Sequence, residues 1–160
     1  MAKSLPIITH PNKSLRGKSE EVVKNKIDTE EINQLIRNMI KTMLERDGIG
    51  LSAPQIGKNI RLIIINTEDG VLIMFNPKTT KKSWFRQLDQ EGCLSVPNTF
   101  GSVKRHKKIV CCFLNKQGEE DKIKAEGFLS RVIQHEIDHL DGILFIDKAK
   151  NIQKVTEESP

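Results

Sequence analysis

The sequence predicts an α+β fold in which antiparallel strands pack around one central metal-binding helix. Three observations support this prediction. The chain has 160 residues, about the length of one domain, and no repeat or linker divides residues 1–160. Short apolar runs are separated by turn residues, which is typical of antiparallel strands. One amphipathic segment near the C-terminus carries two histidines four residues apart, which would share one helix face.

A polar arm, residues 1–27, precedes the first predicted helix. Asp28 and Glu31 have the spacing of a capping box, in which two side chains satisfy free N–H groups at a helix start. Apolar residues then recur three and four apart, and we interpret the stripe that they form as core: Ile32, Leu35, Ile36, Met39, Ile40, Met43 and Leu44. Asp47-Gly48 ends this helix.

Four short runs after the first helix are predicted strands, at residues 61–66, 71–76, 108–115 and 143–146. Residues 77–90 are polar and basic, and we expect them to form a loop. A second helix is predicted over residues 127–140, with Gly142 just beyond its end. Residues 148–160 read as a polar C-terminal tail.

Composition excludes several classes of protein. A membrane-spanning helix needs about 20 apolar residues, and the longest apolar run, residues 109–114, is far shorter. The formal net charge of +5 permits an anionic partner without requiring one. With 4% aromatic residues and no Tyr, the chain has little surface for stacking on bases. We therefore expect no membrane and no sequence-specific nucleic-acid partner.

Cysteine usage indicates a reducing compartment. The chain has three cysteines, Cys93, Cys111 and Cys112, and two of them are adjacent. An odd count with a vicinal pair argues against a disulfide framework. The N-terminal residues do not resemble a secretory signal. These observations predict a cytoplasmic protein.

The strongest chemical signal is His135-Glu136-Ile137-Asp138-His139. On a helix, both imidazoles can hold one metal ion, and Glu136 can reach a water molecule beside it. Catalytic sites of this type use three protein ligands and leave one position open. Phe145 stands where a third histidine would complete one familiar pattern, and the polar tail is a poor anchor for Glu157 or Glu158.

Cys93 is the remaining candidate for the third ligand. It lies in Glu91-Gly92-Cys93-Leu94-Ser95, where Gly92 lets other backbone approach closely. Cys111 and Cys112 lie in an apolar strand, where cysteine usually behaves as a small hydrophobic residue.

Three segments resemble the motifs of the peptide deformylase family, in the family's order and at similar spacing. They are Gly48-Ile49-Gly50-Leu51-Ser52-Ala53-Pro54-Gln55, Glu91-Gly92-Cys93-Leu94-Ser95 and His135-Glu136-Ile137-Asp138-His139. The similarity extends over most of the chain. Two positions depart from the family: Ser52 stands where Ala is usual, and Phe100 stands near where some members carry an arginine that touches substrate.

The resemblance implies a hydrolase that removes the formyl group from the N-terminal formylmethionine of newly synthesised polypeptides and releases formate. Cys93, His135 and His139 would hold a metal ion, and a water molecule on that ion would attack the formyl carbon. Glu136 would act as general base. The resemblance assigns stabilisation of the oxyanion to the Gln55 amide and the backbone N–H of Leu94.

Substrate-binding residues are implied in the same way. An extended N-formylmethionyl peptide would pair with the backbone of Ile49 and Gly50. The methionine side chain would enter a slot lined by Ile49, Phe128 and Val132, with Arg131 at its rim. Two further positions are glycines that leave room for another chain, Gly48 and Gly92.

Two arguments about the identity of the metal give different answers. A Cys-His-His donor set by itself favours Zn²⁺. The resemblance implies Fe²⁺ in the native enzyme, and we favour Fe²⁺, with Zn²⁺, Ni²⁺ or Co²⁺ able to take its place. A thiolate beside a redox-active metal predicts loss of activity in air.

Two other functions are compatible with these motifs. A metallopeptidase that cuts internal bonds shares the His-Glu-x-x-His chemistry, although Cys93 in its E-G-C setting favours deformylation. A non-catalytic module with a structural metal could dock on an RNA-rich surface through residues 78–86 and 104–108. A structural metal has no need of Glu136. The same basic segments can be solvated loops, or can dock the enzyme at the ribosome, where its substrate emerges.

Two acidic residues within the motifs are each open to two interpretations. Glu91 is either a solvated carboxylate or the buried partner of a residue such as Arg105. Asp138 faces away from the paired histidines and is either a surface charge or a partner that orients a ligand histidine.

Overall fold

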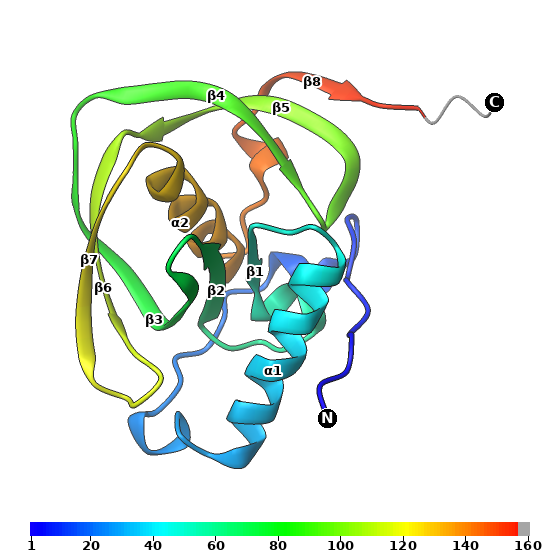
Figure 1. Cartoon of the computed structure of the whole chain (residues 1–160). Coiled ribbons are helices and arrows are strands. Elements are labelled where there is room, and N and C mark those ends of the chain that lie inside the picture. Colours follow the sequence, from blue (N-terminus) through cyan, green and yellow to red (C-terminus); the bar gives the residue numbers. More distant parts are fainter. Residues whose placement is uncertain (157–160) are drawn as a thin grey trace.

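Two antiparallel sheets enclose helix α2 (Gly127–Leu140) in the computed structural model, which describes residues 1–156 (Figure 1). The five-stranded sheet has the order β1-β2-β3-β6-β7, with bounds Gly50–Ser52, Leu62–Thr67, Gly70–Lys82, Lys108–Leu114 and Glu120–Glu126. The three-stranded sheet has the order β4-β5-β8, with bounds Arg86–Cys93, Val96–His106 and Lys150–Lys154. Helix α2 packs against β1 and β2 of the first sheet and against β5 of the second. The predicted α+β class and the second helix are confirmed.

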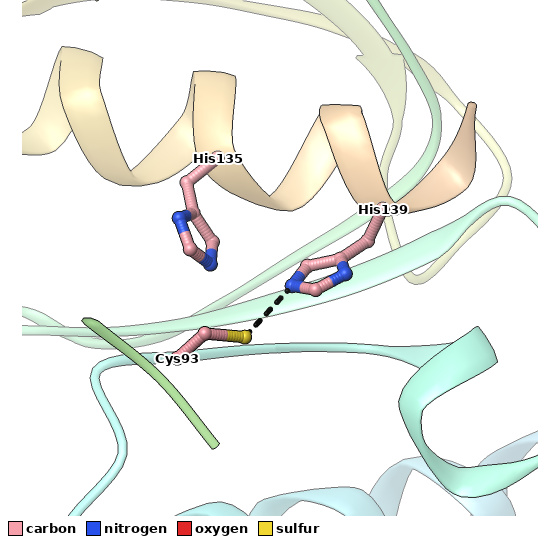
Figure 2. Close-up of side chains that lie close together, drawn as sticks. All are labelled: Cys93, His135 and His139. Atoms are coloured by element: carbon pink, nitrogen blue, oxygen red, sulfur yellow. Dashed lines mark hydrogen bonds between the residues drawn. The ribbon is translucent and has the colours of Figure 1, made fainter. Parts of the chain in front are cut away.

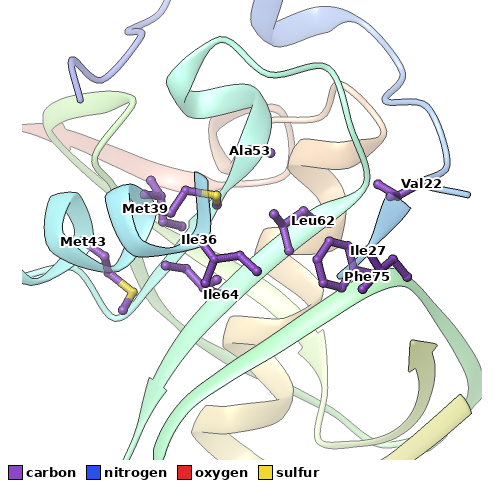
Figure 3. Close-up of a cluster of buried hydrophobic side chains, with 10 residues drawn as sticks. Val22, Ile27, Ile36, Met39, Met43, Ala53, Leu62, Ile64 and Phe75 are labelled. Carbon is purple, nitrogen blue, oxygen red and sulfur yellow. The ribbon is translucent and has the colours of Figure 1, made fainter. Parts of the chain in front are cut away.

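Strand β2 is apolar on both faces because each face is covered by a helix. Side chains alternate along a strand, so Leu62 and Ile64 enter a core with α1 (Glu30–Glu45), whereas Ile63 and Ile65 enter the core with α2. Figure 3 shows the first of these cores, where α1 meets β2. The interpretation of the α1 stripe as core is confirmed at its centre, whereas Leu44 at its end is half exposed.

The start of α1 differs from the prediction by one residue. Thr29, not Asp28, is the N-cap: its hydroxyl oxygen accepts a hydrogen bond from the backbone N–H of Ile32 at 3.4 Å. The Asp28 carboxylate instead accepts from the side chain of Asn33. The predicted capping box is therefore wrong, because two neighbouring residues could both cap and the chain entered the helix at the second.

Most of residues 77–90, expected as a loop, form strand instead, and only residues 83–85 make a corner. Strand β3 runs on to Lys82, where it pairs with Ile109 of β6, and β4 begins at Arg86, opposite His106 of β5. The prediction failed because these residues are polar and most of them stay exposed. Their backbone hydrogen bonds to neighbouring strands, rather than apolar side chains, hold them in place.

The predicted strand at residues 143–146 is also wrong. Leu144 and Phe145 are adjacent, and both side chains are buried in the same core. Adjacent side chains of a strand would point to opposite faces. A 3₁₀ turn, η4 (Phe145–Asp147), places both beneath the three-stranded sheet, and the Asp147 carboxylate accepts the N–H of Leu144 at 2.9 Å. Part of the expected polar tail then forms β8, which pairs with β5.

The N-terminal arm is anchored rather than loosely draped over the surface. It contains two short turns, η1 (Lys13–Arg16) and η2 (Lys24–Lys26), and buries Leu15 completely. The backbone N–H of Ile8 donates to the carbonyl of Gln55, and that of His10 donates to the carbonyl of Ser95. The arm therefore ties together η3 (Ala53–Ile56) and the start of β5. No helix in the described part is long and apolar enough to cross a membrane.

Candidate metal centre and active site

Helix α2 and strand β4 bring three predicted metal ligands together. His135 and His139 lie one turn apart on α2, with ring centroids 5.0 Å apart, and both rings point toward Cys93 at the end of β4 (Figure 2). One ligand atom from each residue can be chosen so that all three lie within 4.8 Å of one another. The helical period explains the pairing of the histidines, whereas the third ligand arrives from a strand far away in sequence.

The spacing of these atoms fits a metal ion. Zn–S and Zn–N bonds of about 2.3 and 2.0 Å in a tetrahedron place the two donors about 3.5 Å apart. The Sγ atom of Cys93 lies 3.3 Å from Nε2 of His139. One sulfur and two imidazole nitrogens, converging on a single point, form a donor set suited to Zn²⁺ and to other divalent transition metals.

The turn after β4 sets the position of Cys93. The register of β4 and β5 shifts between Gly92 and Cys93, which opposes Val96. A Cβ atom on Gly92 would lie 2.9 Å from the ring of Phe100. Gly92 is therefore needed because the aromatic ring of the neighbouring strand lies directly against its backbone.

Glu91 fixes the orientation of His135. Its carboxylate lies 2.8 Å from Nδ1 of His135, which leaves Nε2 of that ring free to bind a metal. The same carboxylate accepts two hydrogen bonds from Arg105, at 2.9 and 3.0 Å. Burial alone would raise the pKa of Glu91, but the hydrogen bonds from His135 and Arg105 outweigh burial and lower this pKa to about 2. Glu91 is therefore a buried anion, and the interpretation as a partner of Arg105 is confirmed.

Arg131 lines the pocket, but its guanidinium is buried in a charged cluster rather than exposed at the rim. Its guanidinium is buried and donates to the Glu91 carboxylate at 2.6 Å. It also donates to the backbone carbonyls of Val103 and Gln87 at 2.8 and 2.7 Å. Five donors in a planar fork suit arginine to this role of joining α2 to both strands of the β4–β5 hairpin.

Asp138 extends the same charged cluster away from the histidines. It is buried, and it pairs with Arg105 and with the Lys148 ammonium, the latter at 2.9 Å. The chain of contacts thus runs from Lys148 through Asp138, Arg105 and Glu91 to His135. Asp138 acts on the ligand through two intermediates, so neither of its two sequence interpretations describes it fully.

Glu136 lies beside the ligands and is only 4% exposed. Within the described residues its Oε2 atom has no hydrogen-bond partner. Burial raises the pKa of Glu136 to about 7, partly offset by the positive charge of His135. A Cβ atom on Gly50 would lie 2.5 Å from Oε1 of Glu136, so this glycine is required by close approach. A buried carboxyl that titrates near neutrality suits proton transfer.

The Gln55 amide is held at both ends. Its Oε1 accepts the backbone N–H and the hydroxyl of Ser52, each at 2.9 Å. Its Nε2 donates to the hydroxyl of Ser95 at 3.1 Å and faces Sγ of Cys93 at 3.6 Å. The arrangement is a capping box on η3, and the S-x-x-Q spacing in the sequence is a signal that could have revealed it.

In the metal-free protein the two histidines differ in protonation. Burial alone would lower the pKa of His135, but hydrogen bonds to Cys93 and Glu91 outweigh burial and raise this pKa to about 10. Burial and the positive charge of His135 lower the pKa of His139 well below 6.5. The cluster therefore holds one positive charge at this point, which a metal cation would replace.

A pocket of about 630 Å³ opens onto these residues. Its lining contains all the predicted catalytic and substrate-binding residues, together with Cys93 and His135: Gly48, Ile49, Gly50, Gln55, Gly92, Leu94, Phe128, Arg131, Val132 and Glu136. Ile49 and Phe128 are 46% and 62% exposed, which leaves apolar surface available to a ligand. Strand β1 forms one edge of its sheet, beside this pocket.

Comparison with known proteins agrees with this arrangement. The model of the family described as polypeptide deformylase matches residues 4–155. The peptide deformylase of Pelotomaculum thermopropionicum is 43% identical over 149 residues, which cover 93% of this chain and 94% of that protein. The peptide deformylase of Desulfitobacterium hafniense is 45% identical over 135 residues, covering 84% of this chain and 89% of that protein.

Solved structures show the same fold. A class I type b peptide deformylase from Acinetobacter baumannii superposes with a TM-score of 0.90 at 36% identity, covering 92% of this chain and all of that chain. A peptide deformylase from Synechococcus elongatus, solved in complex with actinonin, gives 0.88 at 39% identity, covering 94% of this chain and 82% of that one. The chain belongs to the polypeptide deformylase family.

Proposed function

We propose that this enzyme removes the formyl group from N-formylmethionyl peptides with Glu136 as the group that moves the proton. The observation that carries the proposal is the buried Glu136 carboxylate, whose Oε2 atom lacks a partner in the described residues, beside the Cys93, His135 and His139 cluster. A divalent ion held by these three residues would acidify a bound water molecule and polarise the formyl carbonyl. We propose residues 1–160 as one catalytic domain, with α2 as its central metal-binding helix.

Glu136 takes a proton from the attacking water molecule as the new C–O bond forms at the formyl carbon. The carbonyl oxygen then carries negative charge. The Gln55 amide nitrogen, and the backbone N–H of Leu94, donate hydrogen bonds to it. Glu136 returns the proton to the nitrogen as the C–N bond breaks. The products are formate and a free amino terminus.

The substrate peptide extends along the free edge of β1. It pairs with the backbone of Ile49 and Gly50 and so adds a strand to the five-stranded sheet. Its methionine side chain contacts the exposed apolar faces of Ile49 and Phe128, with Val132 behind them. Gly48 and Gly92 line the pocket beside this path, where their missing side chains make room for Leu94 and for the Phe100 ring of the same chain. Arg131 contributes through Glu91, to which it donates, rather than from a rim.

We favour Fe²⁺ as the native metal, with Zn²⁺, Ni²⁺ or Co²⁺ as substitutes, because a soft thiolate and two imidazoles accept each of them. A cytoplasmic location and docking near the ribosome stay predictions. Family membership favours this reaction over cleavage of internal peptide bonds and over an inert structural metal.

The test is formate release from a formylmethionyl peptide by protein purified without oxygen, next to Glu136→Ala. Both proteins are checked for metal content and for thermal unfolding. We expect activity in the parent and a loss of at least 10²-fold, on the order of a general-base contribution, in a fully metallated variant. A metallated Glu136→Ala protein with parental activity would remove Glu136 from the mechanism. Folded, metallated parent protein without formate release would refute the whole proposal.

A further inference from the structure

Two aromatic side chains are exposed at the corner between β3 and β4. Trp84 is 96% exposed and Phe85 is 58% exposed, and Trp84 is the only tryptophan in the chain. The backbone beneath them is held firmly. The Ser83 N–H donates to the carbonyl of Lys108 at 2.8 Å, and the Lys107 N–H donates to the carbonyl of Phe85 at 3.1 Å. A well-anchored turn that exposes a whole indole is available for a partner.

A basic pocket of about 630 Å³ lies beside this corner. Seven of its lining side chains are Lys or Arg and two are Asp, a surplus of five positive charges that equals the formal net charge of the whole chain. Both aspartates are already paired: Asp138 with Arg105 and Lys148, and Asp141 with Arg61. This concave surface is therefore strongly basic.

Four cations in this pocket are available for an anionic ligand. Lys78 and Lys82 come from β3, Arg86 from β4 and Lys104 from β5. All four are exposed, and none forms an ion pair with any residue in the range 1–156. Lys82 and Arg86 also flank the aromatic pair in sequence. Positive charges in a hollow reinforce one another's field and attract anions.

The basic pocket is separate from the active site. The two pockets share no lining residue. Helix α2 divides them, with Gln134, Ile137 and Asp138 on the basic side, and Val132 and Glu136 on the active-site side. A ligand in the basic pocket would leave the entrance for the formylated peptide open.

We propose that this corner binds single-stranded nucleic acid. Successive phosphates contact Lys78, Lys82, Arg86 and Lys104, and an unpaired base stacks on Trp84. Proteins that hold single strands without reading sequence combine a basic groove with exposed aromatic rings, and this corner has both. The composition provides few aromatic residues, but two consecutive ones, Trp84 and Phe85, are exposed at this corner beside the basic pocket.

Two other occupants fit the observations less well. A membrane surface would favour cations around a broad apolar face, whereas here they line a hollow and Lys107 Nζ lies 5.9 Å from the centre of the Phe85 ring. A second copy of the chain would bring two surfaces of like charge together.

Trp84 makes a direct experiment possible, because all tryptophan fluorescence of the chain comes from this site. The metallated enzyme is titrated with oligouridylate RNA of about 12 nucleotides, within the range of single-strand site sizes. Tryptophan quenching and the anisotropy of a labelled strand are followed between about 50 and 200 mM salt. We expect saturable quenching and a plot of log K against log salt concentration with a slope of about −2.8, or −0.7 for each of four contacts.

Variants separate charge from stacking. The double variant Lys78→Gln, Arg86→Gln should reduce the magnitude of the slope of log K against log salt concentration by about 1.4. Trp84→Ala should weaken binding by about 5- to 150-fold with the slope unchanged. The control, Lys13→Gln with Lys26→Gln, removes equal charge from the exposed turns η1 and η2 and should change little. Formate release is measured in every variant, and parental values would show that the pocket variants are folded.

Binding of deoxythymidylate of equal length supports the proposal, with the difference from RNA measuring the contribution of the 2′-hydroxyl. Absence of quenching and of anisotropy change overturns it. Equal loss of affinity in the control pair overturns the assignment to this pocket. Competition by inorganic polyphosphate, together with no effect of Trp84→Ala, reduces the site to a simple anion pocket. A blue shift of tryptophan emission on phosphatidylglycerol vesicles, without RNA binding, replaces nucleic acid with a lipid surface.

Discussion

The hydroxyl of Ser52 donates a hydrogen bond of 2.9 Å to Oε1 of Gln55. Peptide deformylases usually have Ala at this position, so the hydroxyl is an addition to the motif. Together with the backbone N–H of Ser52, which also donates to Oε1, this bond orients the amide so that Nε2 points toward Cys93 and Ser95. Ser52 thus acts through Gln55, as a positioning residue for the proposed oxyanion donor.

Ser52→Ala should therefore lower kcat by about 2- to 12-fold, the worth of one neutral hydrogen bond, and leave KM unchanged. The backbone N–H of Ser52 still holds Oε1, so the loss is partial. Steady-state kinetics on a formylmethionyl peptide measure the effect. Ser14→Ala, an exposed serine on η1, is the matched control. An unchanged kcat would show that the backbone bond alone orients Gln55.

Gly50→Ala should abolish most activity while leaving the protein folded. The new methyl group would lie 2.5 Å from Oε1 of Glu136, the far end of a side chain that can move. The carboxylate is displaced from its position beside the metal ligands, and its contribution as a base, about 10²–10⁴-fold, is lost. Gly17→Ala, where the nearest atom would be 3.8 Å away, is the control. Activity and thermal unfolding are measured together, and a folded, fully active Gly50→Ala enzyme would contradict the proposed role of Glu136.

Glu91→Gln should destabilise the metal-free protein by about 3–5 kcal/mol, because it leaves Arg105 and Arg131 buried beside a neutral amide. Metal affinity should fall about 10- to 100-fold, since the amide orients His135 less strongly. Glu30→Gln breaks an exposed ion pair with Arg37 and should cost less than about 1 kcal/mol. Urea unfolding of both apoproteins makes the comparison. Equal costs would mean that burial does not strengthen the Glu91 cluster.

Metal binding should release protons at neutral pH. Without metal, the pKa of His135 is raised to about 10, so this ring is protonated at pH 8, whereas a ligand imidazole must be neutral at its binding nitrogen. Each unit of rising pH below about 10 should therefore strengthen binding about tenfold for this one proton. Calorimetry of Zn²⁺ binding to chelator-treated protein, in two buffers of different ionisation enthalpy, counts the protons. Binding that does not vary between pH 6 and pH 8 would contradict this expectation.

Much of the metal site could be predicted from local spacing. The i, i+4 interval of His135 and His139 already places both on one face of a helix, and the structure confirms that α2 is a helix. Cys93 could be selected because few other ligand residues were suitably placed, and the family motifs supported it. Local patterns were sufficient here because a helix converts sequence spacing directly into spatial position.

The sequence by itself determined the two helices, the apolar strands β2 and β6 and the candidate ligand residues, because each depends on period or local chemistry. Only the tertiary structure decided the polar second half of β3, the polar strand β4, whose register is set by neighbouring backbone, and the burial of Arg131. It also joined Glu91 to Arg105 and gathered distant cations beside Trp84. Such arrangements depend on contacts between residues far apart in the chain. Sequence periodicity carries no information about them, because their free energy arises only when the sheets have closed around α2.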